Sequence, residues 1–473
     1  MTNERRVAAG WVLGLASASS MMVALDGTVV ATALSRIRLD LGASIEELEW
    51  TVNAYSLSFA VLLMTGAALG DRFGRRRLFI GGLGLFTAGS AWCALTSSAG
   101  WLITARAVQG VGAALVMPLA MALLSAAFPP ERRAKALGLF SGLTGLAVVG
   151  GPVLGGAVTQ GLAWQWIFWF NVPFGLIVIP LVLAKVPESK GPGGKLDLGG
   201  LVLVTGAALA LVWGLIRANG IGWSSPEVEL SLAATPLLLV AFVLWERRIA
   251  APMVPMKLFA SRGFAAGNAL ALFLYAPLYG ALFFVAQYLQ VGQGLGPLET
   301  GLRMIAWTGA VTFMAPLAGA FVNRIGTRPL IFVGLAGQAV GLGWLGLIAR
   351  PDTPYWEMIA PMVIAGACVS MAMPATQVAV INAVAPPQIG KASGVFNTLR
   401  QLGGVLGVAV TAPVFTAAGS YASPHTFADG FRPAMGLAAG ISLTGALIAV
   451  LIPARARAAA PAPVQSLPER TAA

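Results

Sequence analysis

The sequence predicts an all-α polytopic membrane protein with fourteen transmembrane helices, arranged as two six-helix halves with two extra helices between them. Three observations support this fold class. Of the 473 residues, 57% are hydrophobic and only 10% are charged, with a mean hydropathy of +0.81, which excludes an ordinary soluble protein. Apolar windows of about 20 residues, the length that crosses a bilayer, recur along the chain. Two long segments also resemble each other at a fixed offset.

Fourteen apolar windows are candidate membrane spans. They cover residues 9–33, 50–69, 78–97, 101–126, 136–159, 166–185, 198–217, 229–246, 265–290, 299–322, 329–349, 356–381, 392–416 and 433–453. We expect an N-terminal six-helix half in residues 1–190, two inserted linker helices in 191–262 and a C-terminal six-helix half in 263–453. The Ala- and Pro-rich stretch at 454–473 predicts a disordered cytoplasmic tail.

The distribution of positive charge predicts the orientation of these spans. If the N-terminus is cytoplasmic, the cytoplasmic loops and termini carry 22 of the 30 Lys and Arg residues, and the external loops carry 5. Positive residues favour the cytoplasmic side of a membrane, so both termini are predicted to lie inside the cell. The net charge of +12 therefore reflects membrane orientation, and we expect no nucleic-acid partner.

An internal repeat divides the chain. The segment that starts at Arg106 aligns without gaps with the segment that starts at residue 362, and this offset of 256 pairs Pro118 with Pro374. A second pair of segments, at an offset of 252, places Gly74 opposite Gly326. Two similar halves that face each other can enclose a central cavity and open it to either side of the membrane, which is alternating access.

A glycine- and arginine-rich loop joins the second and third windows. Its sequence GAALGDRFGRRRL, residues 66–78, resembles the cytoplasmic loop motif of the major facilitator superfamily. Gly74 suits the tight turn, and Asp71 can pair with an arginine or with the positive end of the next helix. The resemblance implies that Asp71, Arg72, Gly74 and Arg76 control gating between the halves. The alternative is a loop whose positive charge serves only orientation.

Two further motifs lie in the fourth and fifth windows. RAVQGVGAA, which starts at Arg106, resembles a motif of the same superfamily whose arginine influences proton transfer; the alternative is an arginine that anchors the helix at the membrane interface. VVGGPVLGGAV, residues 148–158, resembles the motif that marks antiporters of the superfamily. It assigns Gly151, Pro152, Gly155 and Gly156 to gating, and simple helix packing is the alternative.

The first window contains a single acid, Asp26, in the stretch VALDGTVVATAL. The stretch resembles the first-span motif of the fourteen-span drug:proton antiporter branch. Ionisable residues within a membrane usually mark an ion or proton pathway. We therefore expect Asp26 to carry the coupled proton, with Arg106 nearby and with proton and substrate competing for one cavity; a structural role is the alternative. Four glutamates at window ends are expected to be solvated or interfacial: Glu49, Glu246, Glu299 and Glu357.

Polar and aromatic residues within the windows are candidates for the substrate cavity, although hydrogen bonds between helices are an equally good explanation for each. They are Asn53, Tyr55, Asn268, Tyr275, Gln287, Trp307, Gln377, Asn397 and Arg400. No further acid lies deep in the second half. Neutral, anionic or singly cationic amphiphiles are therefore favoured over dications.

Together, the resemblances imply a proton-coupled antiporter that exports amphiphilic drugs, antibiotics or endogenous natural products across the bacterial cytoplasmic membrane. A solute importer of the same fold and a non-transporting receptor or scaffold are the alternatives. The sequence has no phosphate-binding G-x-x-x-x-G-K-[ST] motif and no cluster with metal-ligand spacing. We accordingly expect no enzyme activity, cofactor or metal, with the proton gradient as driving force, and a monomer in the lipid bilayer.

Overall fold

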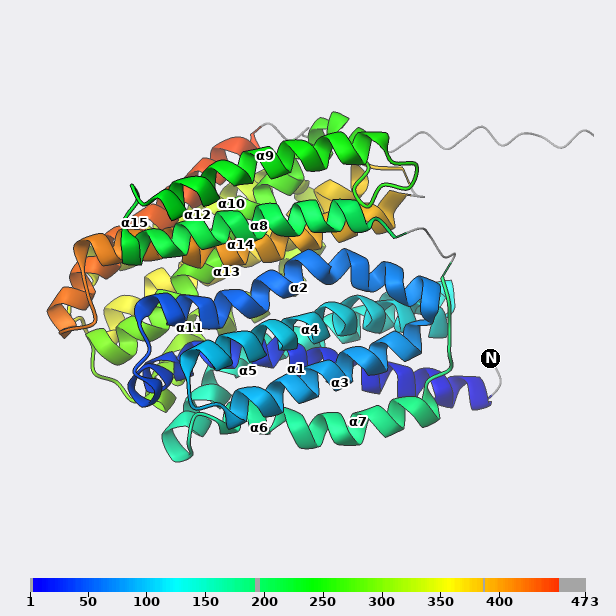
Figure 1. Cartoon of the computed structure of the whole chain (residues 1–473), viewed down its shortest axis with the longest axis horizontal. Helices are drawn as coiled ribbons and strands as arrows, with labels where there is room; N and C mark the ends of the chain where they lie inside the picture. Colours follow the sequence, from blue (N-terminus) through cyan, green and yellow to red (C-terminus); the bar gives the residue numbers. More distant parts are fainter. Residues whose placement is uncertain (1–2, 192–195, 386–387, 451–473) are drawn as a thin grey trace, which may run out of the picture.

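The computed structural model describes residues 3–191, 196–385 and 388–450, and within them the chain is built from helices that run along the long axis of the molecule (Figure 1). The long helices are α1 (Asn3–Leu41), α2 (Ile45–Phe73), α3 (Arg75–Leu95), α4 (Ala99–Ala127), α5 (Pro130–Gly161), α7 (Asn171–Lys185), α8 (Leu198–Ile221), α9 (Pro226–Arg248), α10 (Arg262–Gln287), α11 (Pro297–Ile325), α12 (Thr327–Ile348), α13 (Tyr355–Asn382), α14 (Ile389–Ala418) and α15 (Pro424–Ala449). The short ones are α6 (Trp166–Trp169), the 3₁₀-helix η1 (Met256–Ala260) and the π-helix η2 (Tyr288–Gly292).

The prediction of a polytopic all-α membrane protein is confirmed. Thirteen helical segments in the described part of the chain are long and apolar enough to cross a membrane, with α6 and α7 together forming one of them. The segment α11 is not among the thirteen, although its 29 residues give it sufficient length. Each predicted window overlaps a helix, although the bounds differ: the window 166–185 covers both α6 and α7, and α1 extends well beyond the window 9–33 at both ends.

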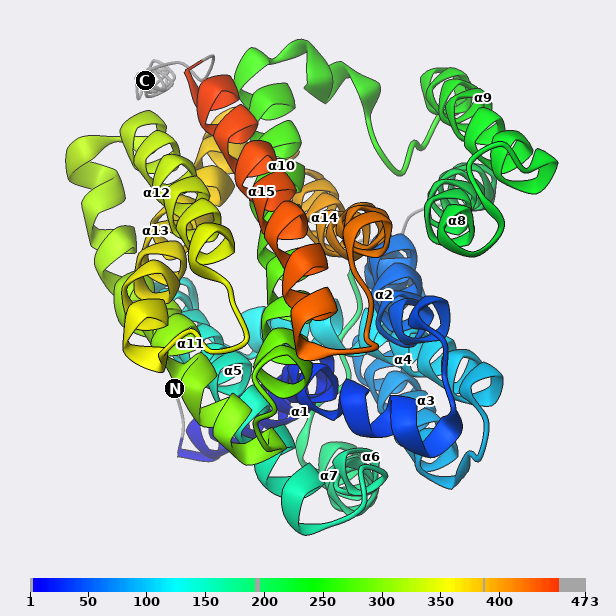
Figure 2. The same ribbon diagram turned by 90° about the vertical axis from the view of Figure 1, so that its left-hand side faces the viewer.

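Two groups of helices pack side by side, and a helical hairpin lies outside them (Figure 2). Helices α1 to α5 and α7 form one group, and α10 to α15 form the other. The hairpin consists of α8 and α9, and α8 packs against α2 of the first group and α14 of the second. The predicted residue limits of these units stay a prediction, and the predicted tail at 454–473 lies outside the described residues.

The turn at Gly74 recurs in the second half of the chain. Gly74 separates α2 from α3 with a φ of +114°, and Gly326 separates α11 from α12 with a φ of +91°. Only glycine adopts such angles without strain. The two glycines paired by the sequence repeat therefore make the same kind of turn.

The two ends of the helices define two faces of the molecule. We call the end where α2 meets α3 the Asp71 face, and the opposite end, where α1 meets α2, the Ser44 face. On the latter, the Ser44 hydroxyl accepts a hydrogen bond from Glu47 N, while the Glu47 carboxylate accepts one from Ser44 N. This reciprocal cap fixes the start of α2.

Candidate functional site

A buried ion pair joins α1 to α4. The Asp26 carboxylate and the Arg106 guanidinium are in direct contact, and both side chains are 1% exposed. Two amides donate to the other oxygen of Asp26: Gln109 Nε2 at 2.8 Å and Asn171 Nδ2 at 3.0 Å. The same two amides donate to Ser90 Oγ, so α3 and α7 belong to the network as well.

Arg106 is also surrounded on its remaining sides. Its Nε donates to the carbonyl oxygen of Thr51 at 3.2 Å, and its guanidinium lies 4.2 Å from the ring centre of Tyr55 and 5.7 Å from that of Phe168. The alternative of an interfacial anchor is therefore wrong, because the side chain points into the helix group rather than toward the membrane surface. These contacts and hydrogen bonds compensate for the cost of removing the two charges from water.

Sequence reasoning missed Ser90 and Asn171. Asn171 opens α7 immediately after the break at Phe170, and no charge or periodicity marks it as part of the site. Ser90 lies in an apolar stretch of α3, where a serine usually bonds to its own helix, and it does donate to Phe86 O. The one available signal in the sequence was that a buried carboxylate needs hydrogen-bond donors, and that polar side chains are scarce within the apolar spans.

Two of the four glutamates expected at solvated or interfacial positions are buried. Glu49 is 0% exposed and Glu246 is 3% exposed. Glu246 accepts a hydrogen bond from Val254 N at 3.1 Å in the segment that follows α9. The expectation was wrong for these two because loops fold over the helix ends. Glu299, in contrast, is half exposed and pairs with Arg303.

Near the Ser44 face, the two helix groups are in contact. The Arg38 guanidinium lies 4.6 Å above the ring of Tyr421, whose hydroxyl donates to Gln287 Oε1. Burial raises the pKa of the Tyr421 hydroxyl, and the neighbouring Glu49 carboxylate raises it further. A second bridge runs from Gln290 Nε2 to Thr32 O, 2.9 Å apart.

The glycines of α5 allow it to pack tightly on both sides near this face. At Gly155, a Cβ atom would lie 2.6 Å from the Val29 carbonyl oxygen of α1; at Gly156, it would collide with the Pro297 carbonyl of α11. Gly301 of α11 is in similarly close contact with α5, because a Cβ atom there would lie 2.4 Å from the Pro152 carbonyl oxygen. The glycine motif of α5 therefore packs on two sides, one toward α1 and one toward the second helix group.

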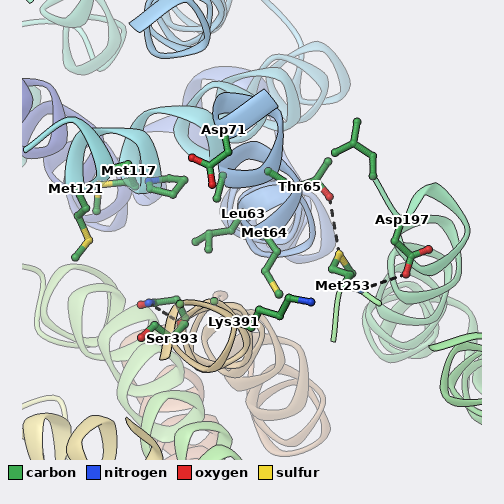
Figure 3. A pocket seen from close by; sticks show the side chains of 18 of the residues that line it. Leu63, Met64, Thr65, Asp71, Met117, Met121, Asp197, Met253, Lys391 and Ser393 are labelled. Carbon is green, nitrogen blue, oxygen red and sulfur yellow. Dashed lines mark hydrogen bonds between the residues drawn. The ribbon is translucent and has the colours of Figure 1, made fainter. Parts of the chain in front are cut away.

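A cavity of about 710 Å³ occupies the half of the molecule nearer the Asp71 face (Figure 3). This size suits a drug-sized molecule. Its walls come from α2, α4, α5 and α14, together with residues 196–198 and 251–253 beside the α8–α9 hairpin. The described lining is mainly apolar and includes Met64, Met117, Met121 and Met253.

The loop motif forms part of the rim of this cavity. Asp71 lines the cavity and pairs with Arg75, with 2.8 Å between Arg75 Nη2 and Asp71 Oδ1. An arginine was one of the two partners expected for Asp71. The start of α3 is capped instead by Glu188, which accepts from Arg76 N at 2.9 Å. Sequence reasoning missed this cap. Arg72 is exposed and stacks on Phe73, with 5.3 Å from guanidinium carbon to ring centre.

Asp197 lies on the opposite part of the rim, at the start of α8. It accepts hydrogen bonds from Gly200 N at 2.8 Å and from Trp245 Nε1 at 2.7 Å. Burial tends to raise the pKa of this carboxyl, but these hydrogen bonds outweigh burial and hold the pKa below its ordinary value. Asp197 is therefore an ionised helix cap that ties α8 to α9.

The comparisons with known proteins identify the family. Residues 16–408 match the model of the Major Facilitator Superfamily, and residues 267–471 match it again. The chain belongs to this superfamily. The "Tetracenomycin C resistance and export protein" of Streptomyces glaucescens is 34% identical over 423 residues, which cover 88% of this chain and 78% of the relative. The "Cephamycin export protein CmcT" of Amycolatopsis lactamdurans is 34% identical, over 96% and 95% of the two chains.

Solved structures give the same fold. A structure described as "Inward open conformation of the xylose transporter XylE from E. coli" superposes with a TM-score of 0.65 at 16% identity, covering 94% of this chain and 97% of that one. This likeness shows the major facilitator fold. With its helices and its relatives, the chain is a multi-pass protein of the bacterial cytoplasmic membrane.

In this superfamily member, the predicted cavity residues have different locations. Only Asn397 and Arg400 line the cavity; Gln377 is exposed. Six others are buried in helix packing: Asn53, Tyr55, Asn268, Tyr275, Gln287 and Trp307. Asp26 is not among the described lining residues either. The expected direct competition between proton and substrate in one cavity is therefore not what the geometry shows.

Proposed function

We propose that this protein is a proton-coupled antiporter that exports amphiphilic drugs, antibiotics or natural products by alternating access. Its relatives are named as export and resistance proteins, and an exporter must load its substrate from the cytoplasm. We assign the Asp71 face to the cytoplasm because most of the Lys and Arg residues lie there, which gives fourteen spans with both termini inside. The cavity would then be open toward the cytoplasm.

The observation that carries proton coupling is the pair of Asp26 and Arg106. Proton binding would neutralise Asp26 and leave the buried guanidinium of Arg106 without its counter-charge. Removal of one partner from a buried ion pair costs about 3–5 kcal/mol. A free energy of this size is enough to shift a two-state equilibrium between conformations by a factor of more than about 100.

The contacts of α1 provide a route from this pair to the gate. Val29, less than one helical turn after Asp26, packs on Gly155 of α5, and Gly156 on the same helix packs on α11 of the second helix group. Movement of α1 on loss of the ion pair would therefore disturb the surface that closes the Ser44 face. Coupling is then conformational: proton and substrate occupy separate sites and favour opposite states.

The test uses inverted membrane vesicles with an acidic interior and a fluorescent reporter of internal pH. Addition of a transported compound to wild-type vesicles is expected to release protons. Asp26→Asn is expected to lose this exchange. Asp40→Asn, the same substitution at an exposed position on the same helix, is the matched control and should exchange normally.

Full exchange by Asp26→Asn would contradict the assignment of the proton site. An importer coupled to protons would give a different result, because addition of compound to the cytoplasmic side would not release protons from the interior. We also propose that one chain suffices as a monomer and that no cofactor takes part, so purified protein in liposomes of defined lipids should perform the exchange alone.

A further inference from the structure

Four charged side chains occur among the described residues that line the cavity, and three of them are satisfied within the protein. Asp71 pairs with Arg75. Asp197 caps α8 through its hydrogen bonds. Lys391 Nζ donates to a backbone carbonyl oxygen at 2.9 Å. The fourth is Arg400, and its surroundings differ.

Arg400 has no carboxylate partner among the described residues. Its guanidinium lies 5.7 Å from the ring centre of Tyr275 and interacts with the Tyr275 hydroxyl, whereas its Nε is buried without a hydrogen-bond acceptor. A guanidinium presents several N–H donors in a fixed plane that matches a carboxylate. A partly buried guanidinium with unused donors, at the wall of a cavity, is therefore suited to an anion that comes from outside the chain.

The rest of α14 orients such a ligand. Ser393, Asn397 and Arg400 are spaced by four and three residues, so they follow one stripe of the helix, and all three line the cavity. Asn397 Nδ2 donates to Ser393 O at 2.9 Å. This stripe gives the cavity one polar wall.

Outside α14 the lining is mainly apolar and rich in thioethers. Met117 and Met121 of α4 lie across the cavity from the α14 side chains, Met64 projects from α2, and Met253 lies near Asp197 (Figure 3). We call these four residues the methionine wall. Methionine is flexible and makes favourable contacts with aromatic rings, which suits flat ligands of varied outline.

We propose that the cavity binds planar, lipophilic monoanions, with the oxyanion at Arg400 and the aromatic body against the methionine wall. This inference rests on the proposed function and names its substrate class. An anionic substrate also gives the transport cycle a voltage dependence, because proton entry and anion exit both move positive charge inward.

The test compares three probes of one shape: anthracene-2-carboxylate, the neutral anthracene-2-carboxamide and the cationic 2-(aminomethyl)anthracene. Binding to the purified full chain in lipid nanodiscs is measured by equilibrium dialysis, with empty nanodiscs subtracted. Wild type is expected to bind the carboxylate at least about tenfold more tightly than the carboxamide, the gain from a charge-assisted hydrogen bond. The cation should bind most weakly.

Variants then show which residues cause the preference for carboxylate over carboxamide. Arg400→Gln should abolish the preference for carboxylate and leave carboxamide affinity unchanged. Lys391→Gln removes another positive charge from the same helix, yet it should retain the preference. Met117→Ala should weaken all three probes alike, by a few-fold. If Arg400→Gln does not fold, Arg400→Lys replaces it: the carboxylate should weaken several-fold and the carboxamide should not change.

Equal binding of carboxylate and carboxamide by wild type would overturn the proposal, as would tighter binding of the cation or an unchanged preference in Arg400→Gln. A variant that weakens all probes equally would show that Arg400 is structural.

Failure of the proposed function is separate. Carboxylate binding that depends on Arg400, without proton exchange in vesicles, would refute antiport alone; exchange of protons for a cation would refute the anion site alone.

Discussion

Arg106 and Arg400 both lie within long membrane-spanning helices, one in each half of the chain, yet their surroundings are opposite. Arg106 is 1% exposed and contacts a carboxylate, an amide oxygen, a backbone carbonyl and two aromatic rings. Arg400 lines a cavity, contacts Tyr275 through the ring and the hydroxyl, and retains a buried Nε without an acceptor.

The difference shows how one residue type can serve two purposes in a membrane. A buried charge that is fully paired within the protein has no capacity left for a ligand, and only a change in its partner's protonation can alter its energy. A charge with unused donors beside a cavity can still gain energy from an anion. We therefore connect the first arginine with the proton and the second with the substrate.

The largest expected effect separates the two arginines by stability. Arg106→Gln leaves Asp26 buried without its counter-charge, so the free energy of unfolding should fall by about 3–5 kcal/mol. Arg400→Gln leaves no buried charge behind and removes only the contact with Tyr275, so the change should be about 1 kcal/mol. Equilibrium unfolding of both variants in mixed detergent micelles, followed by tryptophan fluorescence, measures the difference.

A double variant provides the control. Asp26→Asn combined with Arg106→Gln should recover much of the lost stability, because no buried charge remains, but it should not recover proton exchange. Equal losses for Arg106→Gln and Arg400→Gln would contradict the comparison, since the contact of Arg400 with Tyr275 would then contribute as much to stability as the buried ion pair.

A smaller effect is expected from Gln109, which donates to Asp26 and Ser90 and accepts from Arg106. Gln109→Leu should cost about 1–3 kcal/mol, because polar groups lose buried partners. It also removes one of the donors to Asp26, the proposed proton site, so the pH dependence of exchange should differ from that of wild type. The measurement is exchange in vesicles across a series of pH values.

The matched control for this variant is Gln338→Leu on α12. Gln338 is also fully buried, but both of its amide atoms lack a hydrogen-bond partner. This substitution should leave the pH profile unchanged and cost little stability. A pH shift of equal size in both variants would indicate a general effect of packing and not of the Asp26 network.

Much of the fold could be predicted from the sequence, because hydropathy measures the length of chain that can cross a bilayer. The repeat also predicted the shared glycine turns at Gly74 and Gly326. Hydropathy does not show which side of a helix faces another helix. For this reason the windows located Asn53 and Trp307 within spans but could not distinguish helix packing from a cavity wall.

The candidate site was predicted in part. The motifs of the first and fourth windows led us to expect Arg106 near Asp26, and the two side chains are in direct contact in the structure. Glu49 was expected at a solvated end because it lies near the start of α2. It is buried because Tyr421, from the distant connection between α14 and α15, lies beside it. Such contacts between residues far apart in sequence leave no local pattern.

The smallest effect is expected at Arg303, a third arginine within a long helix, which lies near the start of α11 in the window 299–322. It pairs with Glu299 one helical turn away, Nη2 to Oε1 at 2.5 Å, but the side chains are 24% and 51% exposed. Exposed ion pairs of this spacing contribute about 0.3–0.5 kcal/mol. Arg303→Gln and Glu299→Gln should each change the free energy of unfolding by about that amount, in the same unfolding experiment.

A loss above about 2 kcal/mol would instead show that Arg303 behaves like Arg106, as a buried charge that depends on its partner. A small loss would show that the burial of an arginine, and not its position within a helix, decides how much stability is lost when it is replaced.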